Sequence, residues 1–284
     1  MIKAYYHLTK PGIIYGNAVT AAAGFFLAAK GDIDWKVFIG MLVGLSLIIG
    51  AGCVLNNYFD RDIDGKMERT KNRELVTGTI SQRGAVLYSI LLLAGGVTLL
   101  HTTTTSRALL AALFGFVVYV FIYTPLKRRT EYATLIGAFA GAVPPVVGYT
   151  SITNTYDAAA VILFVTLVFW QMPHFFAIGI FRLKDYAAAK IPIVPIRRGI
   201  VNAKIQSVIF LTLFLFSSLT LVAYHYRGYV FGSVMVITGV LWGWHALRGF
   251  QEGVDDIVWA KKLFRFSLMV LMFFSLSVSV SLHW

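Results

Sequence analysis

Charged residues and cysteine are both scarce in this chain. Only 13% of its 284 residues are Asp, Glu, Lys or Arg, against about 25% in soluble domains, and 58% are hydrophobic. This composition excludes a water-soluble globular protein. Cys53 is the only cysteine, so the chain can form neither an intrachain disulfide nor a structural zinc site built from cysteines. Its position inside an apolar run indicates a packing role.

Uncharged apolar runs of about 18 residues or more recur along the chain, each long enough to cross a bilayer core of roughly 30 Å as a helix. Strands of a membrane barrel would alternate apolar and polar residues, whereas runs such as Ala158–Gly179 are apolar on all sides. We therefore expect an all-α, polytopic membrane protein: a nine-transmembrane-helix bundle that forms a single domain over residues 1–284. The expected spans lie near 13–29, 37–58, 84–101, 107–124, 132–150, 158–180, 205–224, 229–247 and 263–282.

The net charge of +12 is distributed unevenly between the two sides of this bundle. All but four of the 25 Lys and Arg residues lie on the side of the amino terminus; the exceptions are Lys30, Lys36, Arg107 and Arg227. The positive-inside rule makes the amino terminus cytoplasmic and the carboxyl terminus periplasmic, in a bacterial inner membrane. The membrane thus explains the charge, which indicates no nucleic-acid partner. Two long polar loops on the cytoplasmic side, about 60–83 and 181–204, are expected to carry the function.

Three oxygen-bearing side chains share one face at the end of the second span. Asn56, Asp60 and Asp64 are spaced i, i+4 and i+8, which places them on one stripe of a helix. Carboxylates at membrane depth are costly and normally line a cavity or hold an ion, and two of them one turn apart repel unless a cation lies between them. Hard oxygen ligands with positions left open for water and phosphate are typical of Mg²⁺. The pattern therefore favours a magnesium site.

The alternative is a solvated helix end, in which the acidic residues pair with Arg61, Lys66 and Arg69 across the turn. The stretch Glu68–Arg73 favours the metal site, because metal ligands followed directly by cations are what a diphosphate group requires. Asp62 points away from the face that carries the candidate ligands.

The second long loop and the span before it repeat the combination of acid and base. Lys184 and Asp185 open the loop, and His174 lies on the same helical stripe, eleven residues before Asp185 and roughly 16 Å deeper. His174 is predicted either to contact a substrate in the cavity or to be a buried histidine bonded to a neighbouring helix, with the carbonyl freed by Pro173 as a ready partner. The segment Tyr123–Arg129 ends in a further group of cations. These cations either belong to the functional site or only anchor the helix end on the cytoplasmic side, as the positive-inside rule predicts.

These elements resemble the UbiA-type intramembrane prenyltransferases. The Asn-x-x-x-Asp-x-x-x-Asp motif after the second span is similar to the first signature of that family, and Tyr123–Arg128 is similar to its Tyr-x-x-x-Lys-Arg element. Other stretches are similar to the branch of the family that farnesylates protohaem IX, and the match covers nearly the whole chain. They are Asn56–Arg73, Tyr123–Thr130, Gly141–Pro145, Trp170–His174, Asp185–Tyr186 and Ile191–Pro192.

The resemblance implies the residues of a metal-dependent transfer site. Asn56, Asp60, Asp64 and Asp185 are implied as catalytic residues that hold Mg²⁺, and His174 as a contact of the haem acceptor. The implied diphosphate-binding cations are Lys10, Arg69, Lys71, Arg73, Lys127, Arg128 and Lys184. Most of the family carries a second acidic pair four residues apart, whereas Asp185 stands alone here. A second metal ion would therefore have fewer protein ligands.

The reaction implied by the resemblance is an alkylation inside the membrane. Mg²⁺ and the cations withdraw charge from the leaving group of farnesyl diphosphate, the allylic carbon ionises, the vinyl group of haem B attacks it, and water quenches the resulting cation. The resemblance also implies contact with membrane lipid and handover of the product, haem O, to a terminal oxidase or haem A synthase. Two alternatives stay open: a UbiA-type enzyme acting on an aromatic quinone precursor, and a cation transporter that uses intramembrane carboxylates.

Overall fold

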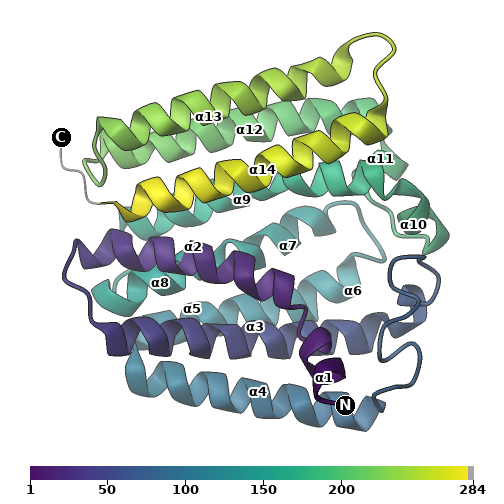
Figure 1. Cartoon of the computed structure of the whole chain (residues 1–284), viewed down its shortest axis with the longest axis horizontal. Helices are drawn as coiled ribbons and strands as arrows, with labels where there is room; N and C mark the ends of the chain where they lie inside the picture. Colours follow the sequence, from purple (N-terminus) through teal and green to yellow (C-terminus); the bar gives the residue numbers. More distant parts are fainter. Residues whose placement is uncertain (281–284) are drawn as a thin grey trace.

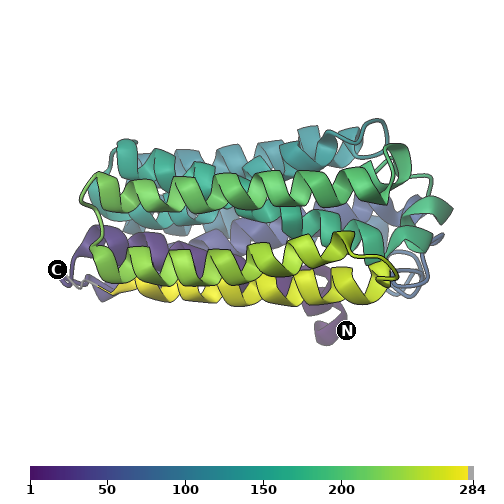
Figure 2. The same cartoon turned by 90° about the horizontal axis from the view of Figure 1, so that it is seen from above.

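Long helices that run along one common axis build the protein (Figures 1 and 2). The computed structural model describes residues 1–280, and no strand occurs in that range. The longer helices are α2 (Pro11–Ala29), α3 (Trp35–Asp64), α4 (Gln82–Thr103), α5 (Ser106–Val117), α7 (Ala133–Gly141), α8 (Val143–Thr153), α9 (Ala158–Phe181), α12 (Ile200–Ala223), α13 (Tyr229–Leu247) and α14 (Asp256–Ser279). The shorter elements are α1 (Ile2–Leu8), the π-helical η1 (Val118–Tyr123), α6 (Thr124–Leu126), α10 (Leu183–Ala188), α11 (Val194–Arg197) and the 3₁₀ turn η2 (Arg248–Phe250). The predicted all-α class is confirmed.

Eight helical segments of the described residues are long and apolar enough to cross a membrane, and they correspond to the first eight predicted spans. Two of these spans are composite: α5, η1 and α6 form one, and α7 and α8 form another. The ninth predicted span, 263–282, corresponds to α14, a helix of 24 residues that packs against α2, α9 and α13. Positions 281 and 282 of that span lie outside the described residues. The multi-pass bundle is therefore confirmed, whereas the count of nine spans stays a prediction.

The connections predicted to be cytoplasmic gather at one end of the bundle, on the right in Figure 1. This end carries α1, residues 65–81 between α3 and α4, and the segment with α10 and α11 between α9 and α12. The first long loop begins later than predicted, because α3 continues to Asp64. The second is shorter than predicted and partly helical, because α10 and α11 lie within it. Both loops meet over the same end of the bundle.

A close crossing of α2 and α8 holds the centre of the bundle together. A Cβ atom added at Gly24 would lie 1.9 Å from the carbonyl oxygen of Pro145, and one added at Gly148 would lie 1.9 Å from that of Ala21. Only glycine permits the two backbones to approach so closely. The break between α7 and α8 at Ala142 immediately precedes the proline-containing first turn of α8, where the proline rings interrupt the helical hydrogen bonding.

Candidate active site

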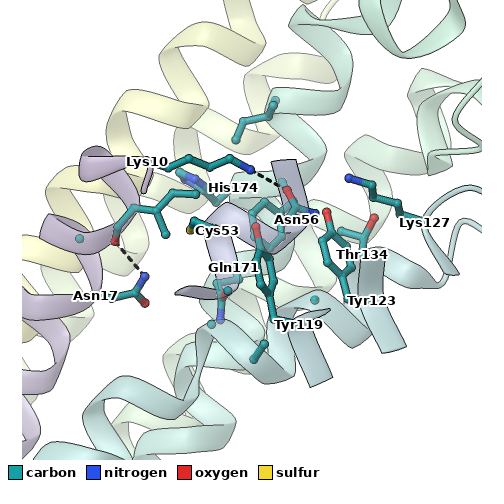
Figure 3. Close-up of a pocket in the computed structure, with 18 of the residues that line it drawn as sticks. Lys10, Asn17, Cys53, Asn56, Tyr119, Tyr123, Lys127, Thr134, Gln171 and His174 are labelled. Atoms are coloured by element: carbon teal, nitrogen blue, oxygen red, sulfur yellow. Dashed lines mark hydrogen bonds between the residues drawn. The ribbon is translucent and has the colours of Figure 1, made fainter. Parts of the chain in front are cut away.

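A cavity of about 660 Å³ lies between α2, α3, η1, α7, α9 and α14. Its polar end is lined by Asn56, Asp60 and Asp64 of α3, near the two long loops. Its other end is lined by apolar side chains such as Leu45, which lies on the same helix about 28 Å from Asp64. Figure 3 shows the polar part of this cavity in close-up. The cavity thus combines a charged mouth with a long apolar interior.

Asn56 and Asp60 are almost completely buried, with 3% and 1% of their surface exposed, and each contacts a lysine from another element. Lys10 Nζ donates a hydrogen bond of 2.6 Å to Asn56 Oδ1 (Figure 3). Lys127, just after α6, forms an ion pair with Asp60 Oδ2. Lys10 caps the start of α2 in the left-handed conformation, with a φ of 55°. That backbone geometry turns the chain between α1 and α2 at the cavity.

Asp64 is 2% exposed and is paired with the first long loop. Arg73 Nη1 donates hydrogen bonds to Asp64 Oδ2 at 2.6 Å and to Asn57 Oδ1 at 3.0 Å. Asn57 Nδ2 in turn donates to the carbonyl of Leu8 at 2.9 Å. Each of the three predicted metal ligands is therefore already neutralised or hydrogen-bonded by a predicted diphosphate-binding cation.

The hypothesis of a solvated helix end is wrong for the two carboxylates that line the cavity, because both are buried and pair with residues far along the chain. For Asp62 only the solvent exposure agrees with it: the side chain is 59% exposed, but it pairs with Arg128, 66 residues along the chain, at 2.7 and 2.8 Å. Arg128 also lies 3.6 Å from Asp60 Oδ1, but it does not line the cavity. The predicted partners Arg61, Lys66 and Arg69 form no ion pair with these acids among the described residues.

The oxygen atoms of the acidic face fit a hard divalent cation. Asp60 Oδ1 is buried and has no hydrogen-bond partner among residues 1–280, which leaves one carboxylate oxygen available to an ion. Within the same range, no group of three or more His, Cys, Asp and Glu side chains is close enough to hold a metal. An ion at this position would therefore take ligands from Asn56, Asp60 and Asp64 and fill its remaining positions with water or phosphate oxygen, as Mg²⁺ commonly does.

The second long loop contributes Tyr186 to the cavity lining, and not the predicted Asp185. Asp185 does not line the cavity; its Oδ1 accepts a hydrogen bond of 3.1 Å from the backbone N–H of Glu68 and thereby ties the two long loops together. The neighbouring Tyr186 lines the cavity and accepts a hydrogen bond of 3.3 Å from Arg69 Nη2. Lys184 is exposed and lies outside the lining.

The predicted cations divide into two groups. Four of them line the cavity: Lys10, Arg69, Arg73 and Lys127. The other three, Lys71, Arg128 and Lys184, do not, and Lys71 instead pairs with Glu68 at 2.6 Å on the surface. Burial, with repulsion from Arg73, lowers the pKa of Lys10 to about 8, and burial also lowers the pKa of Lys127. A polyanion in the cavity would oppose both shifts, because it favours the charged ammonium form.

His174 lies on α9 and lines the cavity. Its Nδ1 is hydrogen-bonded to Ser267 Oγ of α14 at 2.8 Å, so the predicted bond to a neighbouring helix exists, with a hydroxyl rather than the carbonyl freed by Pro173 as partner. Its ring lies between Trp170 and Phe264, with centroid distances of 5.0 and 4.7 Å. The two predicted roles of His174 are therefore compatible: it is bonded to another helix, and it faces the cavity.

Several residues that line the cavity were not assigned to the site from the sequence. Tyr119 stacks on Tyr123 with a centroid distance of 5.6 Å, and both line the cavity. Gln171 donates hydrogen bonds to the carbonyls of Ala138 and Leu167 at 3.0 and 2.9 Å. Cys53, interpreted from the sequence as a packing residue, lines the cavity too. The i, i+4 spacing of the tyrosines was a usable signal, whereas nothing in the sequence indicated the orientation of the Gln171 amide.

Comparisons with known proteins agree with this geometry. The model of the UbiA prenyltransferase family matches residues 17–275. A protoheme IX farnesyltransferase from Pseudomonas savastanoi pv. phaseolicola is 46% identical over 280 residues, covering 98% of this chain and 95% of that protein. Another from Pectobacterium atrosepticum is 47% identical over 281 residues, covering 99% and 95%.

Solved structures of low sequence identity share the fold. A digeranylgeranylglyceryl phosphate synthase has a TM-score of 0.81 at 17% identity, covering 98% of this chain and 97% of that one. A UbiA homologue from Archaeoglobus fulgidus, bound to GPP and Mg²⁺, has a TM-score of 0.74 at 14% identity, covering 98% and 100%. These likenesses establish the helical architecture.

Proposed function

The chain belongs to the UbiA prenyltransferase family, and on that premise we propose that it transfers the farnesyl group of farnesyl diphosphate to a vinyl group of protohaem IX. Water is added in the same reaction, and the products are haem O and diphosphate. The observation that carries this proposal is the identity of 46% over 98% of the chain to a protoheme IX farnesyltransferase. The cavity, charged at one end and apolar along its length, suits a prenyl diphosphate.

The polar end of the cavity is proposed to hold the diphosphate together with Mg²⁺. Asn56, Asp60 and Asp64 would hold the ion, which when bound supplies positive charge to the leaving group. Lys127 and Arg73, which now neutralise the two carboxylates, lie where they can transfer their hydrogen bonds to the diphosphate oxygens. Lys10 and Arg69, the other two lining cations, would add to this positive field.

The apolar interior is proposed to hold the farnesyl chain and to keep water from the reacting carbon. Phe116, Leu167 and Val143 line this part of the cavity. Tyr119 and Tyr123 lie between the charged mouth and the interior, where their ring faces can stabilise positive charge on the allylic carbon. The water that completes the reaction must reach the cation after the new carbon–carbon bond has formed.

Asp185, although implied as a metal ligand, is proposed to act through the first loop. Its carboxylate holds the backbone of Glu68, next to Arg69, and so fixes the position of a lining cation. Lys71, Arg128 and Lys184 lie outside the lining, and the proposal assigns them no contact with the diphosphate.

The two alternatives from the sequence receive less support. A cation transporter would need polar groups along a path across the bilayer, whereas the acids of this cavity lie at one end. Two protohaem farnesyltransferases match the chain almost end to end at 46% and 47% identity, which favours protohaem over an aromatic quinone precursor as the acceptor.

Mass spectrometry of haem tests the proposal directly. The purified protein is incubated with protohaem IX, farnesyl diphosphate and Mg²⁺, and the extracted haem should gain the combined mass of a farnesyl group and one water molecule, less the proton that is released. Release of diphosphate without a change in the haem would indicate another acceptor. Absence of both would indicate that the chain is not a farnesyltransferase.

The cavity mouth is proposed to face the cytoplasm of a bacterium, with the protein in the inner membrane. A cysteine placed at exposed position 72, in a Cys53→Ser background, should then be labelled by an impermeant thiol reagent only after the membrane is opened. A cysteine at exposed position 154, at the other end of the bundle, should be labelled in intact spheroplasts. The opposite pattern would overturn the proposed orientation.

A further inference from the structure

We propose that His174 is an axial ligand of the haem iron and that Ser267 holds it in the required tautomer. This inference rests on the proposed function, because it needs haem in the cavity. Three structural observations carry it: the hydrogen bond between Nδ1 and Ser267 Oγ, the absence of any hydrogen bond at Nε2 among residues 1–280, and the packing of the ring between two aromatic side chains.

The position of one proton decides the tautomer of His174. Ser267 Oγ donates its only proton to the carbonyl of Phe264, at 2.6 Å. With the hydroxyl proton on that carbonyl, the same oxygen accepts at 2.8 Å from His174, and the proposal places the ring hydrogen on Nδ1. Among the described residues no carboxylate pairs with His174, and nothing there favours an imidazolium. In the neutral ring Nε2 then has no hydrogen and keeps a free lone pair.

That lone pair faces the cavity. Nε2 makes no hydrogen bond among residues 1–280, and it is not one of the enclosed polar atoms that lack a partner. It is therefore accessible, and the space next to it is the cavity that His174 lines. Figure 3 draws His174 among the residues around this space.

The ring is held rigidly in that orientation. Trp170 stacks on it at an interplanar angle of 27°, and Phe264 packs on it at 34°. Trp170 Nε1 also donates a hydrogen bond of 2.9 Å to the carbonyl of Ser267, which ties α9 and α14 together at this level. The imidazole therefore presents Nε2 to the cavity at little cost in conformational entropy.

A neutral imidazole with its other N–H bonded to an oxygen is the usual form of a metal-binding histidine. Haem iron commonly takes such a ligand. Ligation at Nε2 would fix the haem plane relative to the cavity, while its vinyl groups remain free at the ring edge. The helices that carry His174 and Ser267 would thereby set which vinyl carbon approaches the farnesyl carbon.

Optical and resonance Raman spectra of haem bound to the purified full-length protein test this assignment. Wild type should give a histidine-ligated spectrum with an iron–histidine stretching band in the ferrous state. His174→Ala should lose that band, and added imidazole should restore the spectrum. The variant should bind haem at least about tenfold more weakly, since loss of even an outer partner of a metal ligand typically costs about 10- to 100-fold. Binding of a non-hydrolysable farnesyl thiodiphosphate should be unchanged. His245→Ala is the matched control, because that histidine lies outside the cavity lining.

Ser267→Ala provides an independent measurement. It removes the acceptor of the Nδ1 hydrogen, so the iron–histidine band should shift in frequency while haem still binds. His174→Gln, which keeps a polar side chain of similar reach, covers the case in which the alanine variant does not fold. A haem spectrum unaltered in His174→Ala or His174→Gln, or a band unmoved in Ser267→Ala, would overturn the assignment. If the wild-type protein farnesylates haem but the variants give such a result, only the ligand assignment is wrong. If the wild-type protein neither binds nor farnesylates haem, the proposed function is wrong.

Discussion

Replacement of Lys127 by methionine should change the affinities for Mg²⁺ and for diphosphate in opposite directions. Lys127 pairs with Asp60, whose carboxylate is buried. In the proposed site, a metal ion that binds Asp60 would displace the Lys127 ammonium, and the diphosphate would become the new partner of that ammonium. Without the lysine, Mg²⁺ meets a carboxylate that no longer has a strong competing cation, and diphosphate loses one of its contacts.

The size of both effects follows from the burial of this pair. The side chains of Lys127 and Asp60 are 15% and 2% exposed, so solvent screens their attraction weakly. A hydrogen bond to a charged group contributes about 1.5–3 kcal/mol, which corresponds to about a ten- to hundredfold change in a dissociation constant. In Lys127→Met we therefore expect Mg²⁺ alone to bind about ten- to a hundredfold more tightly, and diphosphate to bind more weakly by a similar factor.

Isothermal titration calorimetry measures both affinities on the same detergent preparation, with Mg²⁺ alone and with inorganic diphosphate in a fixed excess of Mg²⁺. Arg129→Met is the matched control: it removes an exposed cation from the same segment and should change neither affinity by more than about twofold. A parallel loss of both affinities in Lys127→Met would mean that the lysine only supports the fold of the site. Two unchanged affinities would mean that the ion pair of Lys127 and Asp60 does not open on binding. Either result would contradict the proposed exchange of partners.

Two further sets of substitutions test the site and the fold. Asp60→Ala or Asp64→Ala should lower farnesyl transfer below a tenth of wild type while the protein still inserts in the membrane. Asp62→Ala, on the exposed side of the same helix, is the control and should keep most of the activity. Activity above a tenth of wild type in Asp60→Ala or Asp64→Ala would contradict the metal assignment. Gly148→Ala should lower the melting temperature markedly, because the crossing of α2 and α8 has no room for a methyl group and overpacking costs about 1–3 kcal/mol. Gly243→Ala, whose added carbon would lie 3.6 Å from its nearest neighbour, should melt near wild type, and equal melting temperatures for the two would show that the crossing can relax.

Features that depend on short sequence distances could be predicted. Apolar runs of membrane length correspond to the helices, since backbone groups in a bilayer must be hydrogen-bonded within their own segment. The shared face of Asn56, Asp60 and Asp64 follows from helical periodicity alone, and the structure has it. The basic loops lie at one end of the bundle, as the distribution of Lys and Arg residues and the number of membrane spans between the loops predict.

Features that depend on contacts between distant segments could not be predicted. Lys10 reaches Asn56 over 46 residues and Lys127 reaches Asp60 over 67, and no local pattern specifies either pair. The family resemblance implied that Asp185 would hold a metal, whereas in the structure it accepts a hydrogen bond from a backbone N–H of the other long loop. Such a difference arises because a carboxylate serves equally well as a metal ligand and as a hydrogen-bond acceptor. Tertiary packing decides which partner it meets.

The charges at the cavity mouth explain why a membrane-embedded site can be stable before its substrates arrive. An unpaired carboxylate in a low-dielectric interior costs several kcal/mol. Here Lys127 and Arg73 neutralise the two buried carboxylates, and Lys10 and Arg69, which also line the cavity, leave it with two positive charges in excess. Mg²⁺ alone would increase that excess, and diphosphate alone would reverse it, whereas the two together nearly cancel. The ion and the diphosphate should therefore bind with positive cooperativity, each strengthening the binding of the other by the same factor. A cavity with this excess of positive charge resists loading by Mg²⁺ alone, and the ion should bind most tightly when the diphosphate is already present.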